Sequence, residues 1–317
     1  MTGEARPPGA GPEAVAGRRL RGYAEIAASS LILGTSSTLI QISTMPASLL
    51  LVLRMALGGL ALGAVFLLTH GLEEVRRSGC VRRMVVLGFV VALETMLFFA
   101  AIRGAGVTVA VSLEYMAPVW VALLAPWALR TRRRASDMAA VAVAAGGMAL
   151  LVLPVATAGE GAVSLPGMAA GLLAGLLFAA AMMLVSSMRD AGVRGSTLAL
   201  FYCAATVILF TPLAVWQTAA GGYSFTWTDA WIVAVQGLVY TGLCLSLYTD
   251  GLRFIRVEHA GILGYLEPVT APLWALLFIG EAPPWTTYAG GAVIVGAGIF
   301  VIVFGAREAR APTRSLT

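Results

Sequence analysis

The segment LFFAAIRGAGVTVAVSLEYMAPVWVALLA, residues 97–125, is followed 150 positions later by a related one, LYTDGLRFIRVEHAGILGYLEPVTAPLWA, residues 247–275. Aligned without a gap, the two segments of 29 residues are identical at ten positions. The identities are Leu97/Leu247, Arg103/Arg253, Val107/Val257, Ala110/Ala260, Leu113/Leu263, Tyr115/Tyr265, Pro118/Pro268, Val119/Val269, Leu123/Leu273 and Ala125/Ala275. Similarity at a fixed separation indicates a repeated structural unit. We therefore expect one unit to occur twice in this chain.

The composition places the chain in a lipid bilayer. Apolar residues make up 59% and charged residues 12%, and the mean hydropathy is +0.88, whereas soluble proteins carry about 25% charged residues. A net charge of +5 would suggest nucleic acid for a soluble domain, but membrane orientation explains it here, so we expect no nucleic-acid partner. The three scattered cysteines form neither a disulfide framework nor a zinc spacing. We expect no metal and no cofactor.

Apolar runs long enough to cross a bilayer recur through the chain. We predict an all-α integral membrane protein with ten transmembrane helices, arranged as two inverted five-helix repeats. The spans are 22–42, 46–69, 83–103, 107–129, 136–156, 164–188, 196–217, 230–251, 257–279 and 285–305. The predicted organisation is a disordered cytoplasmic tail (1–21), a first repeat (22–156), a second repeat (164–305) and a cytoplasmic tail (306–317). The first apolar run is too long for a cleavable signal peptide.

The arginines predict the orientation. With the N-terminus inside, 19 of the 21 arginines fall in cytoplasmic segments, one (Arg103) falls in an outer loop and one (Arg54) falls within a span. This excess is the positive-inside pattern, and it predicts a protein of the bacterial cytoplasmic membrane with both termini in the cytoplasm. Four tryptophans fall at the predicted outer ends, as an interfacial aromatic belt requires: Trp216, Trp227, Trp231 and Trp285.

An odd number of helices in each repeat means that the second copy enters the bilayer from the opposite side. The aligned residues Arg103 and Arg253 illustrate this, because one falls in an outer loop and the other in an inner loop. Secondary transporters use inverted repeats, with the substrate site near the midplane between the halves. The sequence therefore favours a transporter that works by alternating access.

The order and spacing of several motifs carry a resemblance to a known family. Both halves repeat a Pro-Val pair on the fourth helix, and Leu266-Glu267-Pro268-Val269 is followed by Gly280-Glu281. With ten spans in two repeats, this pattern resembles the EamA family of the drug/metabolite transporter superfamily over residues 22–305. Arg54 lies where that family often carries an arginine.

The first half departs from the common family pattern. The sequence AVSLEYMAP, residues 110–118, looks like the threonine/homoserine exporter branch, but Ala117 stands where the family usually has Glu before the proline, and the acid is Glu114. The resemblance implies a metabolite carrier, with amino-acid export the best represented activity. It does not fix the substrate.

Four charged residues lie deep within spans, away from their ends: Arg54, Glu94, Glu114 and Glu267. A charge at the bilayer centre costs about 2.5 to 3.5 kcal/mol on insertion scales, so each needs a partner, water or a proton. By helical rise, Arg54 and Glu114 lie about 10 Å from the outer face, and Glu94 and Glu267 roughly 13 to 14 Å from it. Arg54 and Glu114 could form an ion pair, either as a structural tie or with a role in binding or gating. Glu94 is a candidate for proton coupling, or for a hydrogen bond between helices.

The second-half carboxylate has a particular setting. Pro268 lacks an N–H group, so we expect a helix kink that frees the carbonyl of Gly264 beside Glu267. This pair could receive an ammonium group or a proton, or serve as a helix contact. Pro118 predicts the same kink in the first half.

Four aromatic residues are further candidates for substrate contact. Tyr115 and Tyr265 are aligned, and each offers a ring and a hydroxyl next to its kink. Trp120 and Trp274 lie in the middle of their helices, where they cannot belong to the interfacial belt. Core packing is the alternative for all four.

These patterns favour a secondary active transporter or facilitator for small polar metabolites, with amino acids or derivatives as exported substrates and protons as a candidate coupling ion. A drug, nucleotide-sugar or other metabolite carrier is the alternative within the superfamily. A non-transporting membrane scaffold or a channel is the alternative class. We expect no enzyme, since the sequence has no Walker loop, G-x-S-x-G or H-E-x-x-H motif. The sequence does not indicate an oligomeric state.

Overall fold

A computed structural model gives the fold, and every regular element within the residues that it describes is a helix. The described residues are 12–68, 71–128, 139, 141–150, 164–188, 193–251, 254, 263–282 and 284–308. The first half contains α1 (Pro12–Ile42), α2 (Ala47–Leu68), α3 (Gly71–Ser78), α4 (Val81–Ala105), α5 (Val107–Glu114), α6 (Ala117–Ala128) and a helix over 141–150. The second half contains α8 (Leu165–Ser187), α9 (Gly195–Gly221), α10 (Trp227–Ala234), η2 (Val235–Cys244), α11 (Leu245–Gly251), α13 (Leu266–Ile279) and α14 (Trp285–Glu308). The element η2 is a π-helix that continues α10 into α11.

The first helix begins earlier than the sequence suggested. α1 starts at Pro12, so residues 12–21 of the predicted disordered tail are helical, and residues 1–11 lie outside the described part of the chain. Proline is well tolerated in a first helical turn, because its missing N–H would be unpaired there in any case. An ion pair over one turn, from Arg21 Nε to Glu25 Oε1 at 2.7 Å, lies on the same helix. Local helix propensity therefore extends the apolar span outward.

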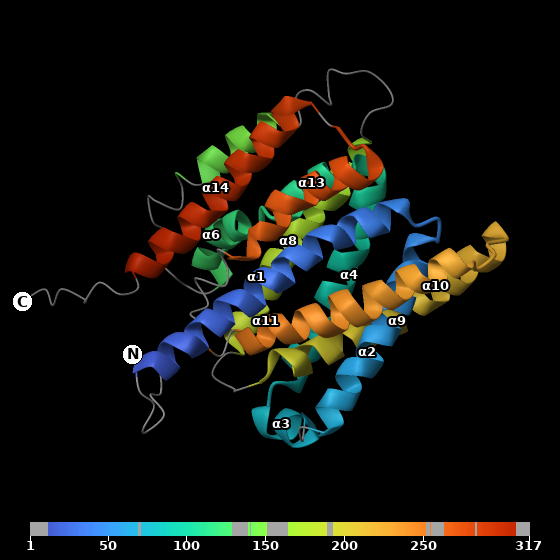
Figure 1. The fold of residues 1–317 in the computed structure, drawn as a ribbon, viewed down its shortest axis with the longest axis horizontal. Coiled ribbons are helices and arrows are strands. Elements are labelled where there is room, and N and C mark those ends of the chain that lie inside the picture. Colours follow the sequence, from blue (N-terminus) through green and yellow to red (C-terminus); the bar gives the residue numbers. More distant parts are fainter. Residues whose placement is uncertain are drawn as a thin grey trace, which may run out of the picture.

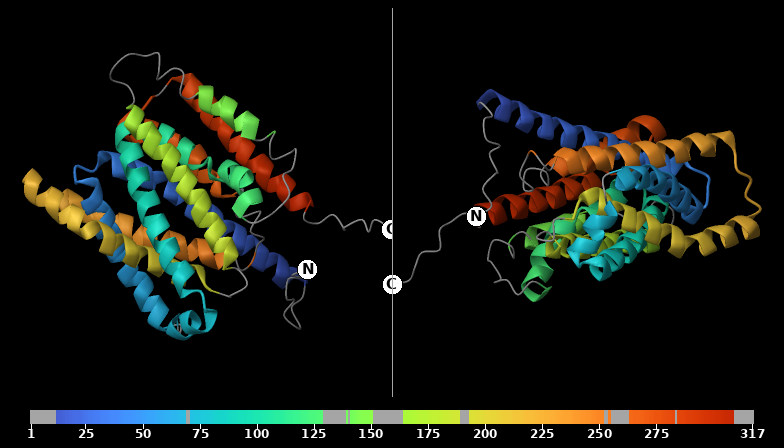
Figure 2. Two further views of the ribbon diagram at one scale, coloured as in Figure 1. Left: turned by 180° about the vertical axis from the view of Figure 1, so that it is seen from behind. Right: turned by 90° about the horizontal axis from the view of Figure 1, so that it is seen from below.

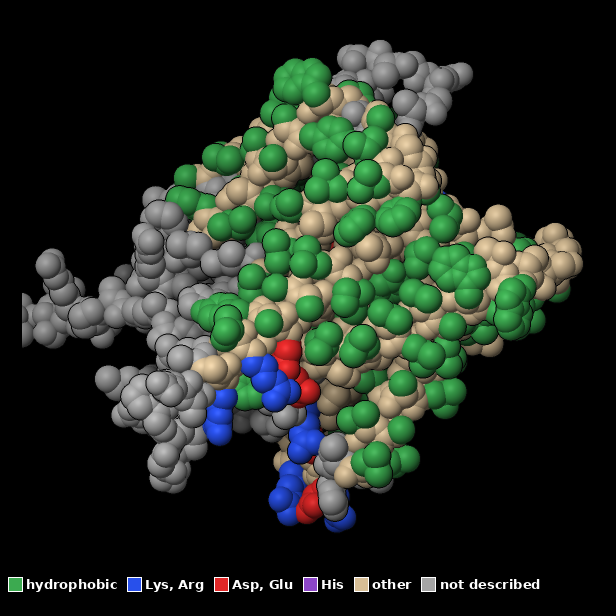
Figure 3. Space-filling model, viewed as in Figure 1, with side chains coloured by type: hydrophobic (Ala, Val, Ile, Leu, Met, Phe, Trp, Pro, Cys, Tyr) green, Lys and Arg blue, Asp and Glu red, His purple; other side chains and the backbone are tan. Residues whose placement is uncertain are grey.

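Apolar helices form most of the molecule. Within the described residues, five helical segments are long and apolar enough to cross a membrane: Ala47–Leu68, Val81–Ala105, Leu165–Val185, Gly195–Gly221 and Trp227–Tyr248. The face in Figure 3 is covered with hydrophobic side chains, while charged side chains gather near α3 and the beginning of α1. The prediction of an all-α membrane protein is thus confirmed.

The positions of the first and last described helices support an even number of membrane crossings. The beginning of α1 and the end of α14 lie at the same end of the bundle, and the connection between α9 and α10 lies at the other (Figure 1, Figure 2). The four tryptophans assigned to the interfacial belt are all exposed. They lie in the second half of α9, in α10 and at the first residue of α14.

The two halves pack on each other symmetrically. In chain order, α1, α2, α4 and α5–α6 correspond to α8, α9, α10–η2–α11 and α13. The contact of α4 with α8 is matched by that of η2 and α11 with α1, and the contact of α5 and α6 with α8 is matched by that of α13 with α1. Likewise, the contact of α4 with α9 is matched by that of η2 with α2. Two further contacts join corresponding helices of the two halves, namely α2 with α9 and α5 with α13. The sequence repeat is therefore also a repeat in packing.

Small residues bring the central helices together. A Cβ added to Gly58 on α2 would lie 2.5 Å from Cβ of Thr241 on η2. One added to Gly88 on α4 would lie 2.9 Å from the carbonyl oxygen of Phe201 on α9. A side chain at either glycine would therefore collide with the facing helix. This packing positions the polar groups of the centre.

Candidate functional site

Both fourth helices break at the same aligned position. In the first half, Tyr115 and Met116 form a turn between α5 and α6, and in the second half Tyr265 forms a turn immediately before α13. The backbone angles agree, with φ −73° and ψ 6° at Tyr115 and φ −70° and ψ −6° at Tyr265. Pro118 and Pro268 follow in the first turn of the resumed helices, where a missing N–H is tolerated. The interruption thus precedes each proline that predicted a kink.

The break in the first half carries a hydrogen bond to the second half. The hydroxyl of Tyr115 donates to Oε2 of Glu267 at 2.8 Å. The rings of Tyr115 and Tyr265 lie 5.6 Å apart between centroids at an angle of 54°. The Tyr265 side chain is 3% exposed, and its hydroxyl has no hydrogen-bond partner within the described residues. Aligned tyrosines therefore meet at the centre, and only one of them binds the carboxylate.

The two acids of the first half form a pair. The carboxyl groups of Glu94 on α4 and Glu114 at the end of α5 interact with each other electrostatically. Glu94 is 6% exposed, and its Oε2 also accepts from Thr95 Oγ1 at 3.0 Å. Gly175 of α8 makes room beside this pair, because a Cβ there would lie 3.1 Å from the carbonyl oxygen of Glu114. The acids come from different helices, and the tight α5–α8 contact holds them together.

Arg54 supplies the positive charge of the cluster. Its Nε donates to Thr241 Oγ1 at 3.1 Å, and its guanidinium carbon lies 5.8 Å from the centroid of the Phe99 ring. It interacts electrostatically with all three carboxyl groups. The ion pair expected with Glu114 is not formed within the described residues. The guanidinium group donates to Thr241 instead. The four charged residues singled out from the sequence thus lie in one cluster, but Arg54 is bound to Thr241 and not to Glu114.

The π-helix η2 contributes residues that the sequence analysis missed. Gln236 is fully buried, its Nε2 donates to the carbonyl of Ser36 at 3.0 Å, and its Oε1 accepts from Ser36 Oγ at 3.1 Å. The hydroxyls of Thr35 and Tyr240 are hydrogen-bonded at 2.7 Å. π-Helical turns occur often at functional sites. The sequence could have pointed to Gln236, because its amide lies in an otherwise apolar span and a buried polar group needs a hydrogen-bond partner.

A second missed residue is Glu281, which follows Gly280 in the loop before α14. Its carboxylate oxygens accept from the backbone N–H groups of Val107 at 3.0 Å and Thr108 at 2.9 Å. Carboxylates are favourable at helix N-termini, where N–H groups lack partners. Gly106, with φ 84°, makes the turn into α5. Glu281 therefore ties the second half to the start of the helix that carries Glu114.

The two tryptophan candidates lie apart from this cluster. Trp120 packs against an apolar group that includes Val109 and Met116. Trp274 stacks on Phe278 at 5.7 Å between centroids. Neither indole N–H has a hydrogen-bond partner within the described residues. The structure does not bring either ring to the carboxyl groups.

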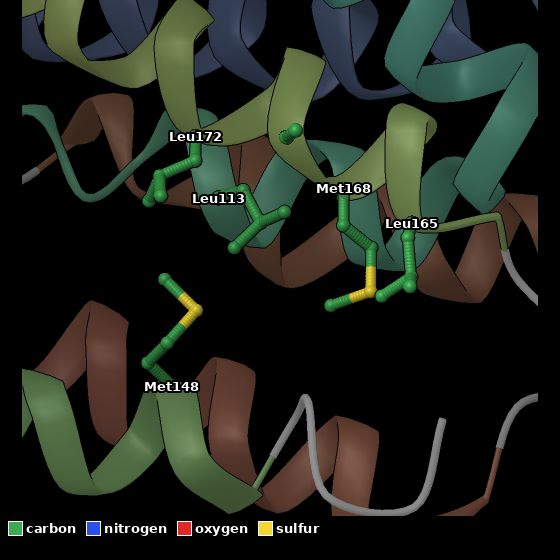
Figure 4. Close-up of a pocket in the computed structure, with 6 residues that line it drawn as sticks. Leu113, Met148, Leu165, Met168 and Leu172 are labelled. Carbon is green, nitrogen blue, oxygen red and sulfur yellow. The ribbon is translucent and has the colours of Figure 1, made fainter. Parts of the chain in front are cut away.

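The cavity in Figure 4 is also separate from the charged cluster. It has a volume of about 210 Å³ and is lined by apolar side chains. Leu113, Leu165, Met168 and Leu172 lie on one side of it and Met148 on the other (Figure 4). None of its six lining residues carries a charged or hydrogen-bonding side chain. Within the described part of the chain, no group of three His, Cys, Asp or Glu residues could hold a metal ion.

A polar cluster between two packed, repeated halves of a membrane protein is the arrangement that secondary transporters use. A sequence model of the EamA-like transporter family matches residues 20–153 and again residues 165–304. The chain therefore belongs to the EamA-like transporter family, within the drug/metabolite transporter superfamily.

Relatives agree with this assignment. An uncharacterized transporter of Archaeoglobus fulgidus is 26% identical over 283 residues, which are 88% of this chain and 95% of that protein. The uncharacterized transporter YxxF of Bacillus subtilis is 24% identical over 202 residues, 62% of this chain and 61% of that one. A chain solved by crystallography aligns with a TM-score of 0.59 and 23% identity, over 92% of this chain and 99% of its own length. That last likeness supports the fold alone.

Proposed function

We propose that this EamA-like transporter exports small polar metabolites, amino acids or their derivatives, across the bacterial cytoplasmic membrane, with both termini in the cytoplasm. The observation that carries the proposal is the hydrogen bond from Tyr115 to Glu267, which joins the two halves at their helix breaks. Glu267 offers a negative charge for a substrate ammonium group, and Arg54 offers a positive charge for a carboxylate. A zwitterion complements both charges.

The symmetry of packing supports alternating access. Because the contacts of α1, α2 and α4 with the other half have counterparts in those of α8, α9 and η2, exchanging the two sets of contacts would open the opposite side of the membrane at similar energy. Tyr115 and Glu267 lie on helices from different halves, so such rocking would change their separation. Substrate binding between them would then depend on the conformation. The acid pair of Glu94 and Glu114 is the place where protons would enter the cycle.

The test is counterflow in proteoliposomes. Vesicles containing the purified protein are loaded with one unlabelled amino acid at a time and then given the same amino acid in labelled form. We expect transient, saturable accumulation for at least one amino acid. Flux that does not saturate would indicate a channel. If no amino acid gives counterflow but a nucleotide sugar or a drug does, the substrate class is wrong and the carrier fold remains.

A further inference from the structure

Thr241 on η2 is held by a hydrogen bond that an α-helix does not offer. Its hydroxyl donates to the carbonyl oxygen of Gln236, five residues earlier, at 3.1 Å. Threonines within helices commonly donate to the carbonyl four residues back, as Thr206 of α9 does to Tyr202 at 2.7 Å. The longer reach is possible because residues 235–244 form a π-helix, in which hydrogen bonds span five residues. The π-helix therefore fixes the direction of the Thr241 hydroxyl.

This direction leaves the hydroxyl oxygen free to accept. A hydroxyl has one donor and two acceptor lone pairs, and Nε of Arg54 on α2 donates to the Thr241 oxygen at 3.1 Å. The three groups thus form a directed chain, from Arg54 through Thr241 to the carbonyl of Gln236. Thr241 is 4% exposed, so little water competes for these bonds.

The packing of α2 on η2 sets the distance between Arg54 and Thr241. A Cβ added to Gly58 would lie 2.5 Å from Cβ of Thr241, and one added to Gly237 would lie 3.1 Å from the backbone oxygen of Arg54. Glycines at both positions let the two helices approach closely. The backbones on both sides of the bond are therefore held in place.

The guanidinium group has a second contact, which leaves its far end available. Its carbon lies 5.8 Å from the centroid of the ring of Phe99, which is fully buried. The terminal amino groups of Arg54 make no hydrogen bond to any residue that the structure describes. Two such groups in a fixed plane match the two oxygens of a carboxylate. Phe99 belongs to the same apolar cluster as Tyr115, the tyrosine that binds Glu267.

We propose that Thr241 is a positioning residue of the proposed substrate site. Through its bond to Nε, it aims the terminal amino groups of Arg54 at the carboxylate of an amino acid, while Glu267 receives the ammonium group. Thr241 itself does not touch the substrate. Loss of its hydroxyl frees the guanidinium to rotate, which weakens recognition of the carboxylate and leaves recognition of the ammonium group intact. The inference rests on the proposed function, because it requires a substrate that carries a carboxylate.

The experiment compares an amino acid with its carboxamide, which keeps the ammonium group and has no carboxylate. Counterflow in proteoliposomes gives KM and the maximal rate for the amino acid, and competition with that counterflow gives the affinity of the carboxamide. In Thr241→Val, which keeps the shape of the side chain, we expect KM to rise about tenfold at a nearly unchanged maximal rate. The affinity of the carboxamide should change less than about twofold, and Thr241→Ser, which restores the hydroxyl, should return KM to within about twofold of the wild type.

Thr206→Val is the matched control, since it makes the same change at a fully buried threonine whose hydroxyl bonds to its own helix. We expect a wild-type KM there. KM does not depend on how much of the protein is folded, and Thr241→Ala provides the same measurement if Thr241→Val does not fold. An unchanged KM on loss of the Thr241 hydroxyl, an equal loss for the carboxamide, or an equal rise in Thr206→Val overturns the proposal.

The wild type separates this inference from the function on which it rests. If the wild type gives no counterflow with any amino acid, the proposed substrate class and the role of Thr241 both fail. If the wild type transports an amino acid and loss of the Thr241 hydroxyl leaves KM unchanged, the role of Thr241 alone fails.

Discussion

The fourth helix of the first half and that of the second half have the same backbone and different chemistry. Both break at an aligned tyrosine with nearly equal φ and ψ angles, and both continue through an aligned proline. In the first half the carboxylate precedes the tyrosine, as Glu114, and in the second half it follows the tyrosine by two positions, as Glu267. The repeat therefore preserves the break and varies the charge. A symmetric scaffold can in this way hold an asymmetric site.

The largest effect is expected at Glu267. The Glu267→Gln variant keeps the size of the side chain and an acceptor for Tyr115 but removes the negative charge offered to an ammonium group. Hydrogen bonds to charged groups contribute about 1.5–3 kcal/mol, so we expect counterflow to fall between about tenfold and a hundredfold. The assay is initial-rate counterflow in proteoliposomes, with Glu73→Gln as the control on α3. Wild-type rates in Glu267→Gln would remove this carboxylate from the transport site.

The aligned tyrosines allow a matched comparison of the two halves. Tyr115→Phe removes the hydroxyl that binds Glu267, whereas Tyr265→Phe removes one without a partner within the described residues. We expect about a tenfold loss of counterflow in Tyr115→Phe and a change of less than about twofold in Tyr265→Phe. Equal losses would mean that the rings matter and the hydroxyl does not.

Two glycines that face the fourth helices, Gly175 against α5 and Gly34 against α13, should differ in how much an added methyl group destabilises the fold. A Cβ on Gly175 would lie 2.5 Å from the backbone oxygen of Leu113, while one on Gly34 would meet the side-chain hydroxyl of Thr270. Backbone cannot move aside as a side chain can, so Gly175→Ala should lower the free energy of unfolding by about 1 kcal/mol or more, and Gly34→Ala by less. Thermal unfolding in detergent measures both. A larger loss in Gly34→Ala would contradict the packing described for α8 and α5.

The smallest effect is expected at Glu281. Glu281→Gln removes the charge at the N-terminus of α5 and one of its two acceptor oxygens, which should cost about 0.5 kcal/mol. The same thermal measurement detects it. Pro284→Ala, in the same loop, is the control. No loss of stability in Glu281→Gln would show that the contact with Val107 and Thr108 is dispensable.

The sequence predicted the features that follow from the internal repeat and from the rarity of charged residues in membrane spans. The repeat located both helix breaks, because Pro118 and Pro268 lie at aligned positions. Charged groups are rare in membrane spans, so Arg54, Glu94 and the other two acids could be identified before their neighbours were known. The structure gathers all four in one cluster.

Pairing within the cluster was not predictable. Helical rise gives the depth of a side chain but not the direction in which its helix turns it. Arg54 was therefore matched by depth with Glu114, although its hydrogen bond goes to Thr241. The π-helix has no sequence signature, and it brings Thr241 to Arg54. The bond from Glu281 to α5 joins residues 174 positions apart, a distance at which local patterns carry no information.

Substrate binding to the purified protein tests the central claim most directly. Thermal unfolding is measured with and without the amino acid that gives the strongest counterflow, for the wild type, Glu267→Gln and Tyr265→Phe. A ligand at about 100 times its dissociation constant stabilises the folded state by about 2.7 kcal/mol. The account predicts a clear rise in melting temperature for the wild type and Tyr265→Phe and none for Glu267→Gln. An equal rise in Glu267→Gln would contradict a binding site between the two helix breaks.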